Sequence, residues 1–279
     1  MRLRSLLFVP GDRPERFEKA LASGSDAIIL DLEDSVAPER KEVARAAVRQ
    51  FLSSPASAAR FVRINPLGSG LVYTDLAAAI ACDGLVLPKA EGAASVVELR
   101  RRAGSGCPPI LPIATETPAA IFQLGSFAGC EGLAGLTWGA EDLPAAIGAA
   151  TSREADGRFT PPYEMARSLA LFAAHAAGVP AIDTVYPDIA DGEGLRRYAE
   201  RGARDGFAGM MAIHPAQVPV INRAFSPSEG QLVAARRLVD AFAAAPGIGA
   251  LQIDGRMVDA PHLHQARAIL ARAQAGSQE

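Results

Sequence analysis

The sequence predicts a TIM barrel, the (β/α)8 fold of the α/β class. The chain has 279 residues, and roughly 250 are typical of this fold. Eight short apolar segments alternate with longer stretches of helical periodicity, the pattern of βα units around a parallel sheet. A doubly wound sheet would need only about five or six strands. No Gly-x-Gly-x-x-Gly follows the first segment, so both observations favour the barrel.

The expected strands are nearly all apolar, as strands buried on both faces must be. They are Ser5–Val9, Ala27–Leu32, Arg60–Asn65, Gly84–Pro88, Ile110–Thr115, Gly135–Gly139, Ala181–Tyr186 and Gly209–His214. Glycine or proline borders the expected helices, for example Glu39–Leu52, Ala93–Arg102, Tyr163–Ala177 and Gly194–Arg204. Residues 1–224 are therefore expected to form the barrel.

Residues 225–279 are expected to form a lid segment outside the barrel. A helical pattern covers Ser228–Ala245, and two short segments of alternating polarity follow on either side of Asp254-Gly255. An Asp-Gly pair between such segments is a hairpin signal. A β-hairpin and a last helix, Pro261–Gln274, complete this expected appendage.

Charge and hydropathy narrow the function classes. The net charge is −3, and the basic residues are scattered among acidic ones, so no basic stripe is available for nucleic acid. No apolar run approaches the ~18 residues of a membrane span. The N-terminus has only four consecutive apolar residues before Pro10-Gly11, which indicates a strand rather than a signal peptide. We therefore expect a cytoplasmic protein that acts on a small molecule.

The three cysteines, Cys82, Cys107 and Cys130, lie far apart and lack CxxC spacing. Such spacing would be needed for a zinc site or a redox motif. We therefore expect buried, unpaired thiols in a reducing compartment.

Charged residues stand where the expected strands end. In a TIM barrel these ends converge on one mouth, where catalytic groups lie. The second strand is followed by Glu33 and Asp34, the third contains Arg63, and the fifth and sixth are followed by Glu116 and by Glu141-Asp142. Charges are costly in an apolar barrel unless they are paired or bind a metal. Several carboxylates around one mouth predict a hard divalent cation, and Mg²⁺ fits best.

Structural roles are open for several of these residues. Asp34 and Asp142 could instead cap the helices that follow them, and Arg63 could be a salt-bridging arginine. Glu is a poor N-cap, which favours a functional role for Glu116. Lys89 could be a Schiff-base lysine, and His214 could be a hydrogen-bonded structural residue. The two methionines Met210 and Met211 are expected to fill the core.

Motifs along nearly the whole chain resemble the family of citrate lyase beta subunits and malyl-CoA lyases, within the HpcH/HpaI aldolase superfamily. They occur in the order of that family: Arg4-Ser5-Leu6-Leu7-Phe8-Val9-Pro10-Gly11, Asp31-Leu32-Glu33-Asp34-Ser35-Val36, Arg63-Ile64-Asn65, Leu87-Pro88-Lys89, Gly139-Ala140-Glu141-Asp142-Leu143, Ile213-His214-Pro215 and Asp254-Gly255-Arg256-Met257-Val258-Asp259. Each motif alone is weakly specific, but their shared order identifies the family. One departure is Met210-Met211, where many members carry a Lys before Ile-His-Pro.

The resemblance implies a set of roles. Glu116 and Asp142 would ligate Mg²⁺, with Mn²⁺ as the alternative metal, and Asp259 would be the acid–base residue, supplied by a neighbouring subunit. Arg63 would bind substrate oxygens and be catalytic. The substrate would also contact Glu141, Ile213 and His214, and the metal ligands would be supported by Glu33 and Asp34. Coenzyme A would be held by Phe8, Arg13 and Lys19.

The resemblance further implies a homo-oligomer, a trimer or a pair of trimers, and a carbon–carbon lyase reaction. The expected substrate is a 3-hydroxyacyl-CoA such as citramalyl-CoA or malyl-CoA, cleaved to acetyl-CoA and pyruvate or glyoxylate. Three alternatives remain open: a malyl-CoA thioesterase, a citrate lyase beta subunit that acts on citryl-acyl-carrier protein, and a metal-dependent aldolase for free hydroxy-keto acids.

Overall fold

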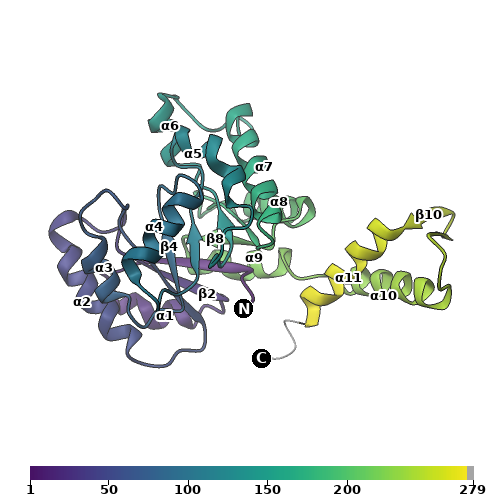
Figure 1. Cartoon of the computed structure of the whole chain (residues 1–279), viewed down its shortest axis with the longest axis horizontal. Coiled ribbons are helices and arrows are strands. Elements are labelled where there is room, and N and C mark those ends of the chain that lie inside the picture. The colour runs from purple at the N-terminus through teal and green to yellow at the C-terminus, as the bar shows by residue number, and fades with distance from the viewer. Residues whose placement is uncertain (275–279) are drawn as a thin grey trace. The chain divides into compact units, whose positions relative to one another are not determined.

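The computed structural model describes residues 1–274, which divide into two compact units. The larger unit is Leu3–Asn222, and the smaller one consists of the segment from Arg223 onward together with Met1–Arg2. In the larger unit, helices surround a set of parallel strands (Figure 1).

The larger unit is a barrel of eight parallel strands, which confirms the predicted fold class. Neighbouring strands follow the order β5-β4-β3-β2-β1-β8-β7-β6. Single bridges from Ile110 to Leu133 and from Ile113 to Thr137 join the two ends of this series. The strands are β1 (Ser5–Pro10), β2 (Ala27–Asp31), β3 (Ala59–Arg63), β4 (Gly84–Leu87), β5 (Ile110–Pro112), β6 (Leu136–Thr137), β7 (Ala181–Asp183) and β8 (Gly209–Ala212).

Most strands end earlier than the sequence predicts. β5 ends at Pro112 instead of Thr115, and β7 ends at Asp183 instead of Tyr186. The apolar pattern continues there because the chain is still buried, but side chains replace strand partners. The hydroxyl of Thr115, for example, donates to the carbonyl of Gly139 and accepts from its N–H, both at 3.1 Å.

Helices separate the strands of the barrel as predicted. In α2 the buried residues Ala44, Val48 and Leu52 recur at i, i+4 and i+8, so one face packs on the barrel. Proline starts α5 and α7, where its missing N–H costs nothing. The helices are α1 (Phe17–Leu21), α2 (Lys41–Leu52), α3 (Val72–Ala78), α4 (Ala93–Ala103), α5 (Pro118–Gln123), α6 (Asp142–Ile147), α7 (Pro161–Ala176), α8 (Gly192–Asp205) and α9 (Val218–Ala224).

Apolar side chains fill the inside of the barrel. Leu6, Ile29, Val86, Ile182 and Met211, from β1, β2, β4, β7 and β8, belong to one buried cluster. The expectation that both methionines of β8 fill the core is correct, since the two side chains are 0 % and 3 % exposed. This packed interior supports the mouth from below.

The smaller unit contains the predicted hairpin between two helices. Helix α10 (Glu229–Ala244) begins with a capping box formed by Ser228 and Gln231. β9 (Ala250–Ile253) and β10 (Arg256–Asp259) pair antiparallel, and α11 (Ala260–Gln274) follows. Asp254 and Gly255 both have positive φ, as a two-residue hairpin turn requires.

The expectation for the cysteines is correct for their pairing and wrong for their burial. The cysteines are unpaired, but Cys82, Cys107 and Cys130 are half-buried rather than buried. They lie at the ends of helices and in the loops before strands, where the packing around them is incomplete. Within residues 1–274, no helix is both long and apolar enough to cross a membrane.

Candidate active site

The predicted charged residues gather in a cavity of about 240 Å³ at the carboxyl ends of the strands. Its lining combines the residues predicted to bind metal and substrate with apolar side chains from the barrel interior. The lining residues are Phe8, Asp31, Asp34, Ser35, Arg63, Ile113, Glu116, Gly139, Ala140, Glu141, Asp142, Thr184, Val185, Met211 and Ile213. Glu33 lies beside this cavity, in contact with Arg63.

Arg63, the last residue of β3, is held in one orientation on one side of the mouth. Its Nε and Nη2 each donate to one carboxylate oxygen of Asp31, both at 2.7 Å. Nη1 lies 2.9 Å from Oε2 of Glu33, and the guanidinium packs over the ring of Phe8 at 4.9 Å. Burial alone would lower the pKa of Arg63, but hydrogen bonding and charge attraction from Asp31 outweigh it and raise the pKa. The group is a fixed cation.

Glu116 is a buried carboxylate on the opposite side of the mouth, and only 4 % of it is exposed. The backbone N–H of Lys89 donates to its Oε2 at 2.5 Å. The pKa of Glu116 is raised to about 8, mainly by burial; the charges of Asp142 and Glu33 act in the same direction, and the N–H of Lys89 opposes them. A cation beside this carboxylate would relieve both costs.

Gly139 makes room for Glu116. A Cβ at position 139 would lie 2.8 Å from Cγ of Glu116 and 3.2 Å from a methyl of Ile113. The glycine that follows β6 is therefore needed for the carboxylate that follows β5, which the sequence pattern alone does not reveal.

Asp34 and Asp142 do not cap helices. Asp142 is the first residue of α6, and the residue in the cap position, Glu141, makes no capping hydrogen bond. Asp34 lies within a short turn rather than at the start of a helix, and its carboxylate lies 4.0 Å from Arg63. Both aspartates, together with Glu141, line the cavity instead.

Lys89 lies between the two sides of the mouth. Its Nζ is 2.7 Å from Oε1 of Glu33 and 3.5 Å from Oδ1 of Asp142. Burial would lower the pKa of Lys89, but the hydrogen bond and charge of Glu33 raise it overall. A Schiff-base lysine needs a lowered pKa to act as a nucleophile, so this ammonium does not fit that role.

The donor set fits a hard divalent cation. Mg²⁺ is commonly bound by one or two carboxylates while water or substrate oxygens complete its coordination. Glu116 and Asp142 both face the cavity and supply such a pair. Residues 1–274 contain no group of three or more His, Cys, Asp or Glu side chains arranged to hold a metal by themselves, so the remaining ligands would be water or substrate.

A second groove, of about 460 Å³, adjoins the mouth and shares Phe8 and Ile213 with it. Lys19 and Arg16 supply its positive charge. Of the residues predicted to hold coenzyme A, Phe8 and Lys19 line this groove and Arg13 does not. Sequence reasoning missed Arg16, although its place three residues before Lys19, on the same face of the turn, was a usable signal.

His214 also lines this groove, next to Ile213. Its Nδ1 accepts a hydrogen bond from the N–H of Ala216 at 3.2 Å, so the imidazole caps the short turn at Pro215–Gln217. The structural role left open for His214 is therefore present. Its position in the groove leaves the predicted substrate contact as a hypothesis.

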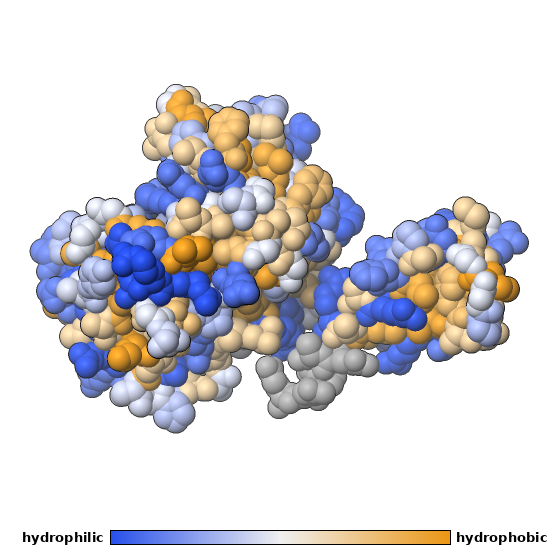
Figure 2. All heavy atoms as spheres, in the orientation of Figure 1, coloured by the Kyte–Doolittle hydropathy of each residue, from blue (hydrophilic) through white to orange (hydrophobic). Residues whose placement is uncertain are grey.

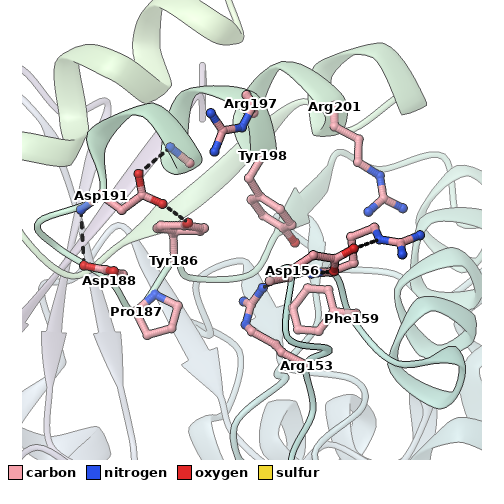
Figure 3. A pocket seen from close by; sticks show the side chains of 13 residues that line it. Arg153, Asp156, Phe159, Tyr186, Pro187, Asp188, Asp191, Arg197, Tyr198 and Arg201 are labelled. Carbon is pink, nitrogen blue, oxygen red and sulfur yellow. Dashed lines mark hydrogen bonds and ion pairs between the residues drawn. The ribbon is translucent and has the colours of Figure 1, made fainter.

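A further cavity, of about 490 Å³, lies beyond β7 between the 153–159 loop and α8 (Figure 3). Several arginines line it, and carboxylates already bind most of them. Arg158 pairs with Asp156 at 2.7 Å, and Arg201 pairs with Glu164 at 2.6 Å. Arg153 packs on Phe159 at 4.0 Å. Because most of its arginines are already paired with carboxylates, this cavity is a weaker active-site candidate than the mouth.

Asp259 closes β10 in the smaller unit. Its Oδ1 lies 2.6 Å from Nδ1 of His262, one helical turn further along the chain. The sequence reasoning did not single out His262. A carboxylate beside an imidazole can exchange a proton, which is compatible with the predicted acid–base role.

Fold and mouth together define the class of the protein: a (β/α)8 barrel whose charged residues converge at the carboxyl ends of the strands, as in barrel enzymes. Residues 4–215 match the HpcH/HpaI aldolase/citrate lyase family. The chain therefore belongs to this family of enzymes, which confirms the resemblance found in its sequence.

Full-length relatives carry different activities. The chain is 41 % identical over 269 residues to a citrate lyase subunit beta-like protein of Mycobacterium tuberculosis, covering 96 % of this chain and 94 % of the relative. It is 35 % identical to a (3S)-malyl-CoA thioesterase of Cereibacter sphaeroides, covering 98 % and 95 %. An L-malyl-CoA/beta-methylmalyl-CoA lyase of that organism is 32 % identical, covering 97 % and 94 %.

A solved structure matches nearly the whole chain. The protein CitE from Mycobacterium tuberculosis, in complex with magnesium, acetoacetate and coenzyme A, superposes with a TM-score of 0.85. It is 38 % identical and covers 98 % of each chain.

Proposed function

We propose that this protein is a magnesium-dependent carbon–carbon lyase. It would cleave a 3-hydroxyacyl-CoA of the citramalyl-CoA or malyl-CoA type into acetyl-CoA and a 2-keto acid. The observation that carries the proposal is the small mouth in which a fixed cation, Arg63, faces the carboxylate pair Glu116 and Asp142. The solved relative that contains magnesium, acetoacetate and coenzyme A supports the same cofactor and substrate class.

Glu116 and Asp142 would hold the metal, and Mn²⁺ could replace Mg²⁺ there. When bound, the ion would supply a Lewis acid beside the hydroxyl and carboxylate of the substrate. Glu141, which lines the same wall, would contact the substrate from the side. Glu33 would support this arrangement from behind, since it binds both Arg63 and Lys89.

Arg63 would stabilise the charge that moves as the carbon–carbon bond breaks. The bonding electrons pass to the thioester half as an enolate, while the hydroxyl gives its proton to solvent and becomes the ketone of the 2-keto acid. Because Asp31 already fixes the guanidinium, its charge needs little reorganisation when the enolate forms.

The groove beside the mouth would hold the coenzyme A part of the substrate. Lys19 and Arg16 are suitable partners for its phosphates. Phe8, shared by groove and mouth, can pack on the pantetheine where it enters the reaction site. Arg13 is 54 % exposed at its side chain, and its contribution would be limited to the rim.

Asp259 would protonate the enolate carbon during cleavage and remove that proton during condensation. Family resemblance assigns this residue to the mouth of a neighbouring subunit, which makes the protein a homo-oligomer. An apolar face supports oligomer formation: Met165, Leu169 and Phe172 recur at i, i+4 and i+7 on α7 and are exposed. Hydrophobic surface is visible over α5 to α7 in Figure 2.

Mixed oligomers test the shared site. Asp259→Ala and Glu116→Gln should each be inactive, but co-assembled subunits should regain up to about a quarter of wild-type turnover, because random pairing unites intact mouths with intact lids. Light scattering would give the oligomer size, and exchange of labelled subunits would be followed in parallel. No regain despite proven exchange would mean that Asp259 acts within its own subunit or is not catalytic.

A thioesterase is the second candidate function, because a close relative is a (3S)-malyl-CoA thioesterase. The two reactions differ in their products: the lyase releases a 2-keto acid and acetyl-CoA, whereas the thioesterase releases free coenzyme A thiol. Citramalyl-CoA and malyl-CoA should therefore be incubated with the purified chain alone, and both products measured. Keto acid without stoichiometric thiol is the expected result.

Thiol without keto acid in the same assay would establish the thioesterase. Failure of both reactions, with activity restored only on citryl-acyl-carrier protein, would favour a citrate lyase beta subunit. Cleavage of free hydroxy-keto acids without coenzyme A would favour the aldolase. These outcomes distinguish every function that the sequence left open.

A further inference from the structure

Lys89 contacts carboxylates on both sides of the mouth. It follows β4, which lies between β3 and β5 in the barrel. Its ammonium is 2.7 Å from Glu33 and 3.5 Å from Asp142, while its backbone N–H donates to Glu116. Side chain and main chain of one residue therefore bind three different carboxylates.

The backbone of Lys89 is in the left-handed region, with φ of 51°. A lysine adopts this conformation only where its surroundings impose it, and such residues cluster at functional sites. Here the conformation turns both the N–H and the ammonium toward the mouth. This unfavourable backbone conformation places two hydrogen-bond donors of Lys89 among the carboxylates.

The carboxylates around Lys89 would otherwise repel one another. Glu33 and Glu116 are 3 % and 4 % exposed, so water screens their charges poorly. Asp34, 3.9 Å from the ammonium, adds a further negative charge. A cation is needed to keep these groups together before any metal arrives.

We propose that Lys89 is a built-in counter-ion of the metal site. It holds the mouth carboxylates in place before a divalent cation binds, and its own positive charge then weakens binding of that cation. The proposal rests on the assignment of Glu116 and Asp142 as metal ligands in the proposed function. Lys89 is thus a positioning residue whose positive charge opposes metal binding.

The direction in which metal affinity changes when Lys89 is replaced distinguishes the proposal from a simple structural role. A residue that only tethers the carboxylates would weaken metal binding when removed, because the ligands would lose their positions. A counter-ion would strengthen metal binding when its charge is removed, because repulsion between ammonium and metal disappears. Measured affinity therefore decides between the two roles without reference to catalytic activity.

Three substitutions separate charge from backbone. Lys89→Arg keeps the charge, and Lys89→Met removes it while keeping a long side chain in the same backbone conformation. Lys89→Gly removes the charge but retains the N–H that binds Glu116, since glycine adopts the left-handed conformation readily. Arg204→Met on α8, exposed and distant from the mouth, is the matched control for charge removal.

Mn²⁺ binding to the purified full chain would be measured through the electron paramagnetic resonance signal of the free ion. Lys89→Met and Lys89→Gly should bind Mn²⁺ about three- to tenfold more tightly than wild type, the scale of one unit charge at a partly exposed site. Lys89→Arg and Arg204→Met should stay within about twofold of wild type.

Thermal unfolding supplies a second readout. In EDTA, Lys89→Met should lose about 2–8 °C of Tm, and saturating Mg²⁺ should remove the difference. Equal or weaker Mn²⁺ binding by both uncharged variants, or a Tm deficit that persists in Mg²⁺, would overturn the counter-ion role. If wild type binds no Mn²⁺, the metal assignment of the proposed function fails and this proposal fails with it.

Discussion

The two sides of the mouth handle charge in opposite ways. On the side of β2 and β3, Arg63 is matched by Asp31 and Glu33, so each charge has a partner before any ligand arrives. On the side of β5 and β6, Glu116 has one N–H donor and is raised in pKa by burial and by nearby carboxylates. The charges on the first side are already paired within the protein, and we propose that a bound cation pairs those on the second.

In the proposed reaction, the two sides of the mouth would have different tasks. A fixed guanidinium can stabilise developing negative charge without moving, which is how preorganised sites lower barriers. An excess of carboxylate can capture a metal that brings the substrate oxygens with it. Substitutions at the metal-binding side should therefore lower both turnover and metal affinity, whereas substitutions at the Arg63 side should lower turnover alone.

Loss of a metal ligand should have the largest effect. Glu116→Gln or Asp142→Asn should lower kcat at least about a thousandfold, since several kcal/mol of stabilisation by the metal would be lost. Mn²⁺ binding should weaken in both variants, while circular dichroism should still show a folded barrel. Full activity of the wild type after EDTA treatment would contradict the assignment.

Replacement of the fixed cation should have the next largest effect. Arg63→Lys should lower kcat by about 10²–10³. An ammonium cannot make the two-pronged contact with Asp31 that fixes the position of the positive charge at the mouth. In contrast to the ligand variants, Mn²⁺ affinity should remain close to wild type. Turnover near the wild-type value would return Arg63 to a purely structural role.

A smaller effect is expected at the glycine behind Glu116. Gly139→Ala should displace the carboxylate, because the new methyl would lie 2.8 Å from its Cγ. We expect a loss of about 10–100-fold in kcat, and about 1–3 kcal/mol in the free energy of unfolding. Gly125→Ala, where a Cβ meets no atom within 4 Å, is the matched control.

The last effect concerns stability rather than turnover, and it is a dependence on pH. The pKa of Glu116 is raised in the folded protein from 4.5 to about 8, so the folded state binds a proton more tightly than the unfolded state. Metal-free protein should therefore be most stable with respect to this group below pH 4.5 and lose that stability as pH rises toward about 8. Urea unfolding in EDTA at several pH values would give the free energy of unfolding of the wild type and of Glu116→Gln. If the two free energies change with pH in parallel, the pKa of Glu116 is not raised in the folded protein.

Sequence reasoning predicted the barrel because eight buried apolar strands alternating with amphipathic helices leave a clear hydropathy pattern. All eight strands were located, each starting within one residue of its observed start. The strand ends were less accurate. At the mouth, buried apolar residues continue beyond the last strand partner, so hydropathy cannot indicate where side chains such as Thr115 replace the ladder.

The site was partly predictable for a related reason. Charged residues at strand ends stand out in an apolar pattern, and this identified Arg63, Glu116 and Asp142 as residues of one mouth. Contacts that depend on three-dimensional packing did not stand out. The space that Gly139 leaves for Glu116, and the turn of Lys89 toward three carboxylates, arise between strands that are distant in sequence.

The seam between β5 and β6 has a dynamic consequence. Most neighbouring strands of the barrel share a continuous ladder, but these two meet through single bridges, including the bond from the N–H of Ala114 to the carbonyl of Thr137 at 2.9 Å. Glu116 follows one of these strands and Asp142 follows the other. A cation bound by both carboxylates would link β5 and β6 at the place where the barrel has few strand hydrogen bonds. The amide of Ala114 would then exchange its hydrogen more slowly with solvent.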